Sequence, residues 1–179
     1  PNSMVLIGGE NINIKNCQLG AQPTGITCKA QGVNKLSFVN NQVYPDGREN
    51  LVHDGCNNCI VEGNNFKSYY NGILVLSGND NRVNKNIFWL TGALQNQMLD
   101  HGDDFGIINV KGNNNMFVSN SLSCEWAYTD AVAVNATQGT GNVFKNCFID
   151  NLESYRVFLV NSGTEVSNCV SSDKVSIVE

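Results

Sequence analysis

The sequence predicts an all-β protein that folds as one right-handed parallel β-helix of about seven turns. Two short motifs recur with a common step, the apolar stretches are short and β-branched, and Asn or Gly separates them. No stretch shows helical periodicity over three turns. The handedness is taken from the fold type. A β-sandwich is the alternative, but it requires antiparallel hairpins, whereas each motif here repeats in the same direction.

The first repeated motif is an apolar residue that follows an Asn-rich corner. It recurs in steps of 24, 23, 21, 35, 26 and 22 residues, at Leu19, Val43, Phe66, Ile87, Leu122, Phe148 and Val170. The second motif is a short apolar strand, which begins near Ile26, Leu51, Ile73, Ile107, Val132 and Val157. Two interleaved motifs with one step predict two strands per turn, each hydrogen-bonded to its equivalent one turn further on.

The corners of the predicted solenoid are rich in Asn. One column of equivalent residues is expected to stack along the axis, at Asn41, Asn64, Asn120, Asn146 and Asn168. An Asn side chain can bond both its neighbour in the stack and the backbone of a turn, so a structural role is expected. Cys17, Cys147 and Cys169 fall at or beside this column, which favours packing over chemistry for these thiols.

The bulk composition fits one domain, residues 1–179, and excludes two classes of partner. Charged residues make up only 15% and the net charge is −5, with no basic run, so a nucleic-acid partner is not expected. No apolar run is long enough to span a membrane. Few charges with many Asn and Gly are typical of a sugar-binding surface. No signal peptide is visible, so the compartment stays open, and secretion is kept as an alternative.

The seven Cys residues include one CxxC, Cys56–Cys59, at a corner. A zinc site would need a second Cys pair or a His pair at ligand spacing, and neither is present. An odd Cys count also argues against a complete disulfide framework. We therefore expect small buried side chains at a turn, with no metal and no cofactor.

The repeat is broken once, where the step of 35 residues inserts about a dozen residues within 88–105. This segment contains aromatic, amide and acidic side chains, the types that pack on sugar rings, bond hydroxyls and transfer protons. The weak catalytic candidates are Asp103, Asp104 and His101, where His101 is a general-base candidate by residue type alone. The alternative is structural, with Asp103 and Asp104 capping a turn and Trp89 covering the flank.

Other turns on the same side of the predicted solenoid carry further aromatic and charged residues. A stripe of this kind would suit an extended glycan or a partner subunit. The predicted substrate-binding residues are Arg48, Tyr69, Tyr70, Trp89, Asp100, Glu125 and Trp126.

Part of the sequence resembles a known family, the inulin fructotransferases and difructose-anhydride hydrolases. Residues 44–74, YPDGRENLVHDGCNNCIVEGNNFKSYYNGIL, resemble that family's aromatic-Pro-x-Gly-Arg turn, Gly-Cys-Asn-x-Cys corner and Tyr-x-Gly-apolar-Leu strand. The GDDFGIINVKGNNNMFVSN rung and the Pro-x-Gly turn in QPTGIT resemble it too. The resemblance implies a β-helix that assembles as a homotrimer, with active sites at subunit boundaries. The implied ligand is an oligo- or polysaccharide, and the implied chemistry is fructosyl transfer within inulin or hydrolysis of the cyclic difructose.

The family's catalytic acids do not carry over to this sequence. Members use an Asp and a Glu about eleven residues apart, but an ungapped alignment places the Glu position at Met4 and the Asp position before Pro1. Glu10 is nearby but occupies the wrong place in its turn. Members are also more than twice as long, so we expect this chain to lack N-terminal turns and a cap. Such an open end predicts oligomerisation through exposed strand edges.

Two other functions remain open from the sequence. The first is a non-catalytic glycan-binding or structural module of a larger surface or phage adhesion protein, which the missing acid pair favours. The second is a different carbohydrate enzyme on the same fold, a lyase or epimerase that uses the acids of residues 100–104. Fold alone cannot choose among these functions.

Overall fold

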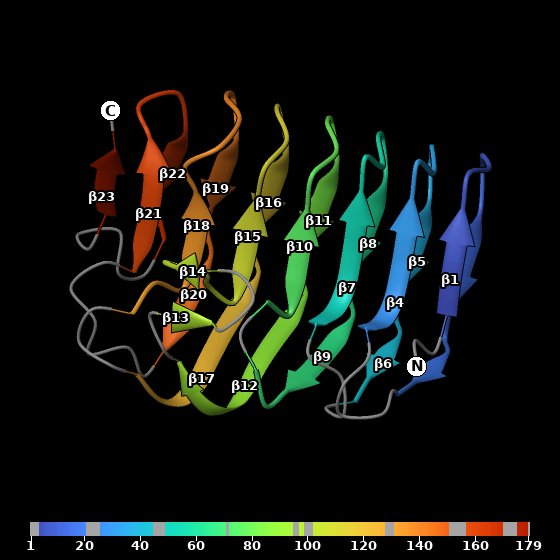
Figure 1. Cartoon of the computed structure of the whole chain (residues 1–179), viewed down its shortest axis with the longest axis horizontal. Helices are drawn as coiled ribbons and strands as arrows, with labels where there is room; N and C mark the ends of the chain where they lie inside the picture. Colours follow the sequence, from blue (N-terminus) through green and yellow to red (C-terminus); the bar gives the residue numbers. More distant parts are fainter. Residues whose placement is uncertain are drawn as a thin grey trace.

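The computed structural model describes residues 4–20, 26–44, 49–70, 72–94, 97–98, 102–127, 131–150, 157–169 and 175–178. The strands stack into a parallel β-solenoid, in which successive turns add strands to three sheets that run along the axis (Figure 1). This confirms the predicted fold class. The described residues form strands and turns, and they include no helix that could cross a membrane.

Three parallel sheets make up the solenoid. The first contains β1 (Met4–Ile7), β4 (Ile26–Gln31), β7 (Glu49–Asp54), β10 (Leu74–Leu76), β15 (Ile108–Val110), β18 (Val134–Ala136), β21 (Phe158–Asn161) and β23 (Val175–Val178). The second contains β2 (Asn13–Lys15), β5 (Ser37–Val39), β8 (Ile60–Glu62), β11 (Arg82–Asn84), β16 (Met116–Val118), β19 (Val143–Lys145) and β22 (Glu165–Ser167). The third contains β3 (Gln18–Leu19), β6 (Gln42–Val43), β9 (Asn65–Ser68), β12 (Ile87–Leu94), β17 (Ser121–Ala127) and β20 (Phe148–Asp150).

The prediction of two strands per turn was wrong, because a third, three-residue strand lies between the two predicted ones. Each strand of the second sheet turns a single side chain inward, such as Phe38, Val61 or Phe117. A strand with one inward side chain shows no repeated alternation of apolar and polar residues, so its sequence does not reveal it as a strand. The third sheet has six described strands, so the complete turns are slightly fewer than the predicted seven.

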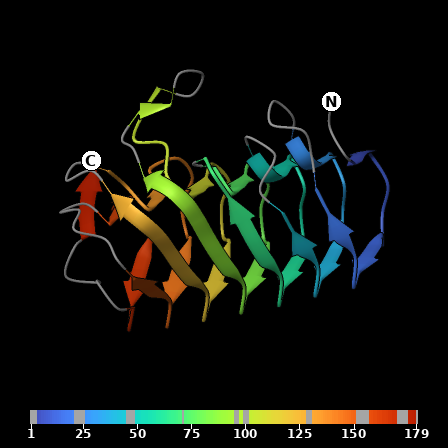
Figure 2. The same cartoon turned by 90° about the horizontal axis from the view of Figure 1, so that it is seen from below.

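The long step in the repeat corresponds to an extension of the third sheet and a small hairpin. β12 and β17 pair beyond the ordinary strand length, with a register shift between Leu90 and Ala93. β13 (Gln97–Met98) then pairs antiparallel with β14 (Gly102–Asp103). Figure 2 shows these two strands standing out from the body of the solenoid. The inserted segment is therefore a local addition, and the parallel stack continues through β15 without interruption.

The interior is filled by apolar side chains from all three sheets, because alternate residues of each strand point inward. Phenylalanine rings stack between register partners, with ring centres 5.0 Å apart for Phe66 and Phe88. They also stack between sheets, with ring centres 6.1 Å apart for Phe38 of β5 and Phe66 of β9. Phe117 and Phe144 stack at 4.4 Å. The repeat therefore buries each apolar face only against the next turn, as expected for a solenoid.

A buried asparagine ladder joins the second and third sheets. Its members are Asn41, Asn64, Asn86 and Asn120, and all four are almost completely buried. In Asn64, Oδ1 accepts from the backbone N–H and Nδ2 of Asn41, and Nδ2 donates to Phe38 O and to Asn86 Oδ1, at 2.8–3.1 Å. These bonds pair polar groups that the corner would otherwise bury unsatisfied. The structural role predicted for the Asn corner is thus supported.

Two predicted members of the ladder, Asn146 and Asn168, lie one residue away from the stack. Both are at least partly exposed and adopt positive φ angles of 54° and 52° at the tip of the turn. Their places in the buried column are taken by Cys147 and Cys169, and the Cys147 N–H donates to the Cys169 Sγ at 3.3 Å. Because a thiol can replace the amide oxygen as an acceptor, the asparagine ladder continues as a cysteine pair.

Candidate functional site

The outer face of the third sheet carries a shallow pocket of about 240 Å³. It spans three adjacent strands, β6, β9 and β12, which Figure 2 places along one side of the solenoid. We call it the aromatic pocket, and its lining residues are Gln42, Val43, Tyr44, Asn65, Lys67 and Trp89.

Strand alternation and parallel register build this pocket. On β9 and β12 the phenylalanines Phe66 and Phe88 point into the core, so their neighbours Lys67 and Trp89 point outward. Lys67 and Trp89 are direct partners in the parallel register, and Tyr44 directly follows β6 one turn below Lys67. Tyr44 and Trp89 are each 41% exposed. Two aromatic side chains therefore flank one lysine, with amides from the same strands beside them.

Lys67 joins the two sides of the pocket. Its Nζ lies 4.4 Å from the centre of the Trp89 ring, a cation–π contact that holds both side chains against the sheet. Its backbone oxygen accepts a hydrogen bond of 2.8 Å from the Nδ2 of the fully buried Asn50. The pocket floor is thus anchored to the core, while the ammonium group stays at the surface.

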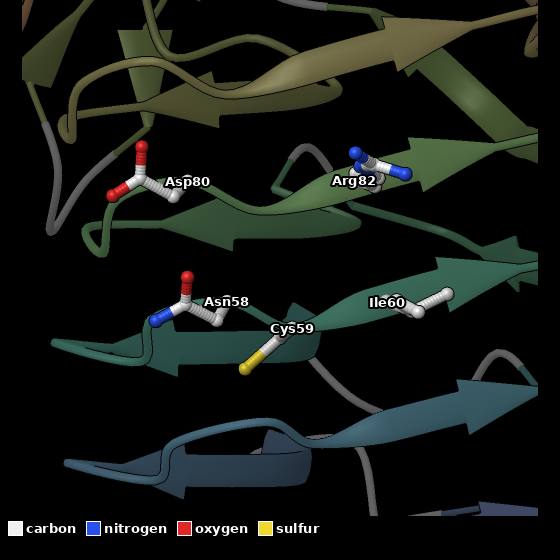
Figure 3. Close-up of a pocket in the computed structure, with 5 residues that line it drawn as sticks. All are labelled: Asn58, Cys59, Ile60, Asp80 and Arg82. Atoms are coloured by element: carbon white, nitrogen blue, oxygen red, sulfur yellow. The ribbon is translucent and has the colours of Figure 1, made fainter.

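A second depression, of about 420 Å³ and more open, lies where the corner meets the second sheet. Figure 3 shows Asp80 and Arg82 on one turn, with Asn58 and Ile60 on the turn before it. Ile60 and Arg82 are register partners on β8 and β11. This depression offers charge and one amide but no aromatic ring, so it is less suited to a sugar face than the aromatic pocket.

Of the predicted substrate-binding residues, Trp89 lies in the aromatic pocket and three others lie near it. Tyr69 and Tyr70 are exposed directly after β9, where the Tyr70 N–H donates to the Ser68 Oγ at 3.2 Å. Glu125 is exposed on β17 of the same sheet. The third sheet therefore brings four of the predicted residues to one side of the solenoid.

The remaining predicted site residues can be placed only in part. Arg48, Asp100 and His101 lie outside the described residues. Asp103 belongs to β14 and Trp126 to β17, but only their backbone positions are described.

Asp104 and its neighbours tie the inserted segment to the first sheet. The Asp104 carbonyl oxygen accepts a hydrogen bond of 2.8 Å from the Asn135 Nδ2. The Phe105 ring lies so close to Gly72 that a Cβ there would come within 2.5 Å of it. Asn109 bonds both the N–H and the carbonyl of Gly106, at 2.9 and 2.8 Å. These contacts give this end of the inserted segment a structural role.

Gln42, Tyr44, Asn65 and Lys67 are pocket residues that the sequence analysis did not select. The sequence did contain a signal for these residues. Each of them lies directly before or after an apolar member of the first repeated motif, which is Val43 for Gln42 and Tyr44 and Phe66 for Asn65 and Lys67. Such a residue must point outward when the apolar residue points inward. From the sequence, Tyr44 is expected only as the aromatic residue of the aromatic-Pro-x-Gly-Arg turn.

The cysteines pack within the solenoid. The pKa of Cys56 is lowered to about 7, because its thiolate accepts a hydrogen bond from Cys59, and that contact together with burial raises the pKa of Cys59. Burial raises the pKa of Cys28 to about 12. Within the described residues, no group of three or more His, Cys, Asp or Glu side chains is placed to hold a metal ion.

Comparison with known proteins gave matches only among solved structures. A search of family models found no match, and a search of curated proteins found none either. DFA-IIIase from Arthrobacter chlorophenolicus A6, solved without its lid, is 20% identical with a TM-score of 0.84 and matches 99% of this chain and 52% of that chain. The same protein in complex with GF2 is 19% identical, with a TM-score of 0.79, and matches 99% and 53%.

A mutant of that protein in complex with DFA-III is 21% identical, with a TM-score of 0.77, over 99% of this chain and 52% of that one. This chain thus spans about half the length of the solved structures it matches. At about 20% identity, the likeness to these structures establishes the fold. It confirms the resemblance seen in the sequence as a resemblance of fold. The chain has the parallel β-solenoid fold of DFA-IIIase.

Proposed function

We propose that this chain binds an oligosaccharide of the fructan class in the aromatic pocket on the third sheet. One observation carries the proposal: Tyr44 and Trp89 flank an opening that also presents amides and an ammonium group. The fold supports the choice of ligand class, because DFA-IIIase shares it and has been solved with GF2 and with DFA-III.

The chemistry of the pocket suits a neutral sugar. Aromatic rings offer flat apolar faces to the C–H side of a sugar ring, while amides donate to and accept from its hydroxyls. Lys67 adds further donors, and its Nζ lies over the Trp89 ring. Pockets that combine apolar walls with a few polar groups are the usual form of small-ligand sites.

Catalysis needs groups that the aromatic pocket does not contain. Hydrolysis or transfer of a glycosyl group ordinarily uses two carboxylates on opposite sides of the reacting bond. Among the residues that the structure describes, the lining of the pocket includes no Asp or Glu. Fructosyl transfer giving a cyclic difructose, or hydrolysis of that product, therefore requires acids from elsewhere, for which Asp103 and Asp104 are the candidates. A non-catalytic glycan-binding module is the second proposal, and a pocket whose described lining carries no carboxylate favours it.

Calorimetric titration with inulin-type oligosaccharides tests binding. We expect saturable binding by the unmodified chain and a loss of about tenfold or more in affinity for Trp89→Ala and for Tyr44→Ala. Met116→Ala, an exposed apolar residue on the second sheet, is the matched control and should bind normally. Absence of binding to any inulin-type oligosaccharide would contradict the proposal.

Product analysis separates the enzyme from the binding module. Incubation with inulin and with DFA-III should give cyclic difructose or free oligosaccharide if the chain is catalytic, and Asp103→Asn with Asp104→Asn should then abolish turnover. Binding without product supports the module. The proposed homotrimer is tested by sedimentation equilibrium, where a monomer mass at all concentrations would exclude it.

A further inference from the structure

Exposed aromatic residues recur along the third sheet, and they include Tyr69 and Tyr70 directly after β9. Tyr44 follows β6, Trp89 lies on β12, and Phe148 lies on β20, which is two strands beyond β12. Phe148 is 47% exposed, comparable with the two aromatic residues of the pocket. Neighbouring strands lie about 4.8 Å apart, so Tyr44, Trp89 and Phe148 are spaced by about 10 Å along the axis. Phe148 lies in the register column of Ile87, two residues along the strand from the column of Trp89.

Between the strands of Tyr44, Trp89 and Phe148, β9 and β17 add small or polar side chains to the same face. β9 carries Asn65 and Lys67 outward, and β17 carries Ser121 and Ser123, which are register partners of Ile87 and Trp89. Within the part of the chain that the structure describes, the side chains of Asn65, Ser121 and Ser123 make no hydrogen bond. Their amide and hydroxyl groups are therefore available to a ligand that lies across the sheet.

The described side chains of this face carry little charge. Among the described outward side chains from β3 to β20, the charged ones are Lys67 and Glu125, and the others are amides, hydroxyls, Ile87 and aromatic rings. Alternation of apolar rings with unpaired neutral donors and acceptors matches a polyhydroxylated ligand. A second protein surface is a poorer match, because interface cores are depleted in Ser and Lys, and this face presents Ser121, Ser123 and Lys67.

We propose that the third sheet binds an extended neutral oligosaccharide that lies parallel to the solenoid axis, from the aromatic pocket to a second subsite at Phe148. This inference rests on the proposed function, which it extends from one pocket to the length and direction of the ligand. The path from Tyr44 to Phe148 crosses four strand spacings, about 19 Å. A disaccharide would fill only the aromatic pocket, whereas longer chains would also reach Phe148.

A length series of inulin-type oligosaccharides, from two to six sugar units, tests this directly by calorimetry. For the unmodified chain we expect affinity to rise by about tenfold or more between the shortest ligand and those that span the face, and then to level off. Phe148→Ala should remove that gain and leave the affinity for the disaccharide unchanged. Phe148→Tyr should retain it, and Trp89→Ala should weaken every member of the series.

Controls separate the possible failures. Met116→Ala should leave the whole length series unchanged, and thermal melts check that each variant is folded. Binding of short and long ligands with equal affinity, or an equal effect of Phe148→Ala on all lengths, would overturn the inference and leave the proposed function intact. No binding by the unmodified chain would overturn both. A change in sedimentation mass for Phe148→Ala, without any change in sugar affinity, would show that the face contacts a second copy and would also overturn it.

Discussion

Two groups of buried polar side chains differ in how their hydrogen-bonding atoms are satisfied. In the asparagine ladder, Asn41 and Asn64 use both side-chain polar atoms, because an identical residue lies one turn away. Thr27, Asn50 and His53 are equally buried, yet Thr27 Oγ1, Asn50 Oδ1 and both ring nitrogens of His53 have no hydrogen-bond partner among the described residues. A polar residue in a solenoid thus contributes stability when the repeat supplies its partner, and costs stability when the neighbouring turns carry apolar residues.

The register of the first sheet explains the isolation of His53. Its partners on the neighbouring turns are Ala30 and Leu76, and neither side chain can accept or donate a hydrogen bond. Thr27 and Asn50 lie in a column that continues with Ile73, Ile107 and Val157, all buried and apolar. The N-terminal turns therefore carry polar residues in columns that are apolar further along the axis.

The largest predicted effect comes from breaking the ladder. Asn64→Ala should lower the free energy of unfolding by about 3–5 kcal/mol, because it leaves buried partners on two sides unsatisfied and opens a cavity. Chemical denaturation measures the loss. Asn65→Ala, the adjacent residue on the outer face, should change stability by less than about 0.5 kcal/mol. Similar losses of stability for the two variants would show that the hydrogen bonds of the ladder do not stabilise the fold.

Acid should expose the cost of the unpaired histidine. Complete burial lowers the pKa of His53 to about 4, from an ordinary value of 6.5. The unfolded chain therefore takes up a proton on His53 below pH 6.5 while the folded chain resists it. The contribution of neutral His53 to the free energy of unfolding is therefore fully present above pH 6.5. It is lost as the pH falls towards 4, by about 3 kcal/mol in total.

Comparison of the unmodified chain with His53→Leu isolates this histidine from carboxylates that titrate in the same range. The difference in stability between the two proteins should widen steadily from pH 7 to pH 4. Parallel stability–pH curves would mean that His53 does not resist protonation in the fold.

At neutral pH, His53→Leu should raise the free energy of unfolding by about 1–2 kcal/mol, because it removes two unsatisfied nitrogens from the core. Leucine already occupies the next position of this column at Leu76, so the side chain has a compatible neighbour. Thermal melts at pH 7 measure the gain. Destabilisation would indicate that the ring shape of histidine matters more there than its polarity.

The smallest predicted effect concerns Cys59, whose thiol occupies the position that Asn81 and Asn115 hold on the next two turns. Its Sγ accepts the Leu36 N–H at 3.4 Å, and its own N–H donates to the Asn81 Oδ1 at 2.8 Å. Cys59→Asn should therefore be neutral or slightly stabilising, whereas Cys59→Ala should cost about 1 kcal/mol through the lost acceptor. Denaturant midpoints of the two variants provide the comparison, and a reversed order would exclude this role for the thiol.

Sequence patterns predicted the fold well and the site only in part. The first and third sheets follow from apolar motifs at regular steps, and the ladder follows from Asn at the corners. The second sheet was missed because strands such as β8 bury one side chain each. The register error at Asn146 and Asn168 has a related cause, since an exposed Asn with positive φ and a buried Asn of the ladder occupy adjacent positions.

By itself, the sequence determined that this protein is a stack of parallel strands, because a repeat of this length can bury its apolar residues only against copies of itself. Only the tertiary structure decided which side chains meet. Tyr44, Lys67 and Trp89 are separated by 23 and 22 residues in the chain, yet they line one pocket because parallel pairing places them on adjacent strands. The same pairing decides whether a buried polar residue such as His53 or Asn64 has a partner, since that depends on the exact register of the neighbouring turn.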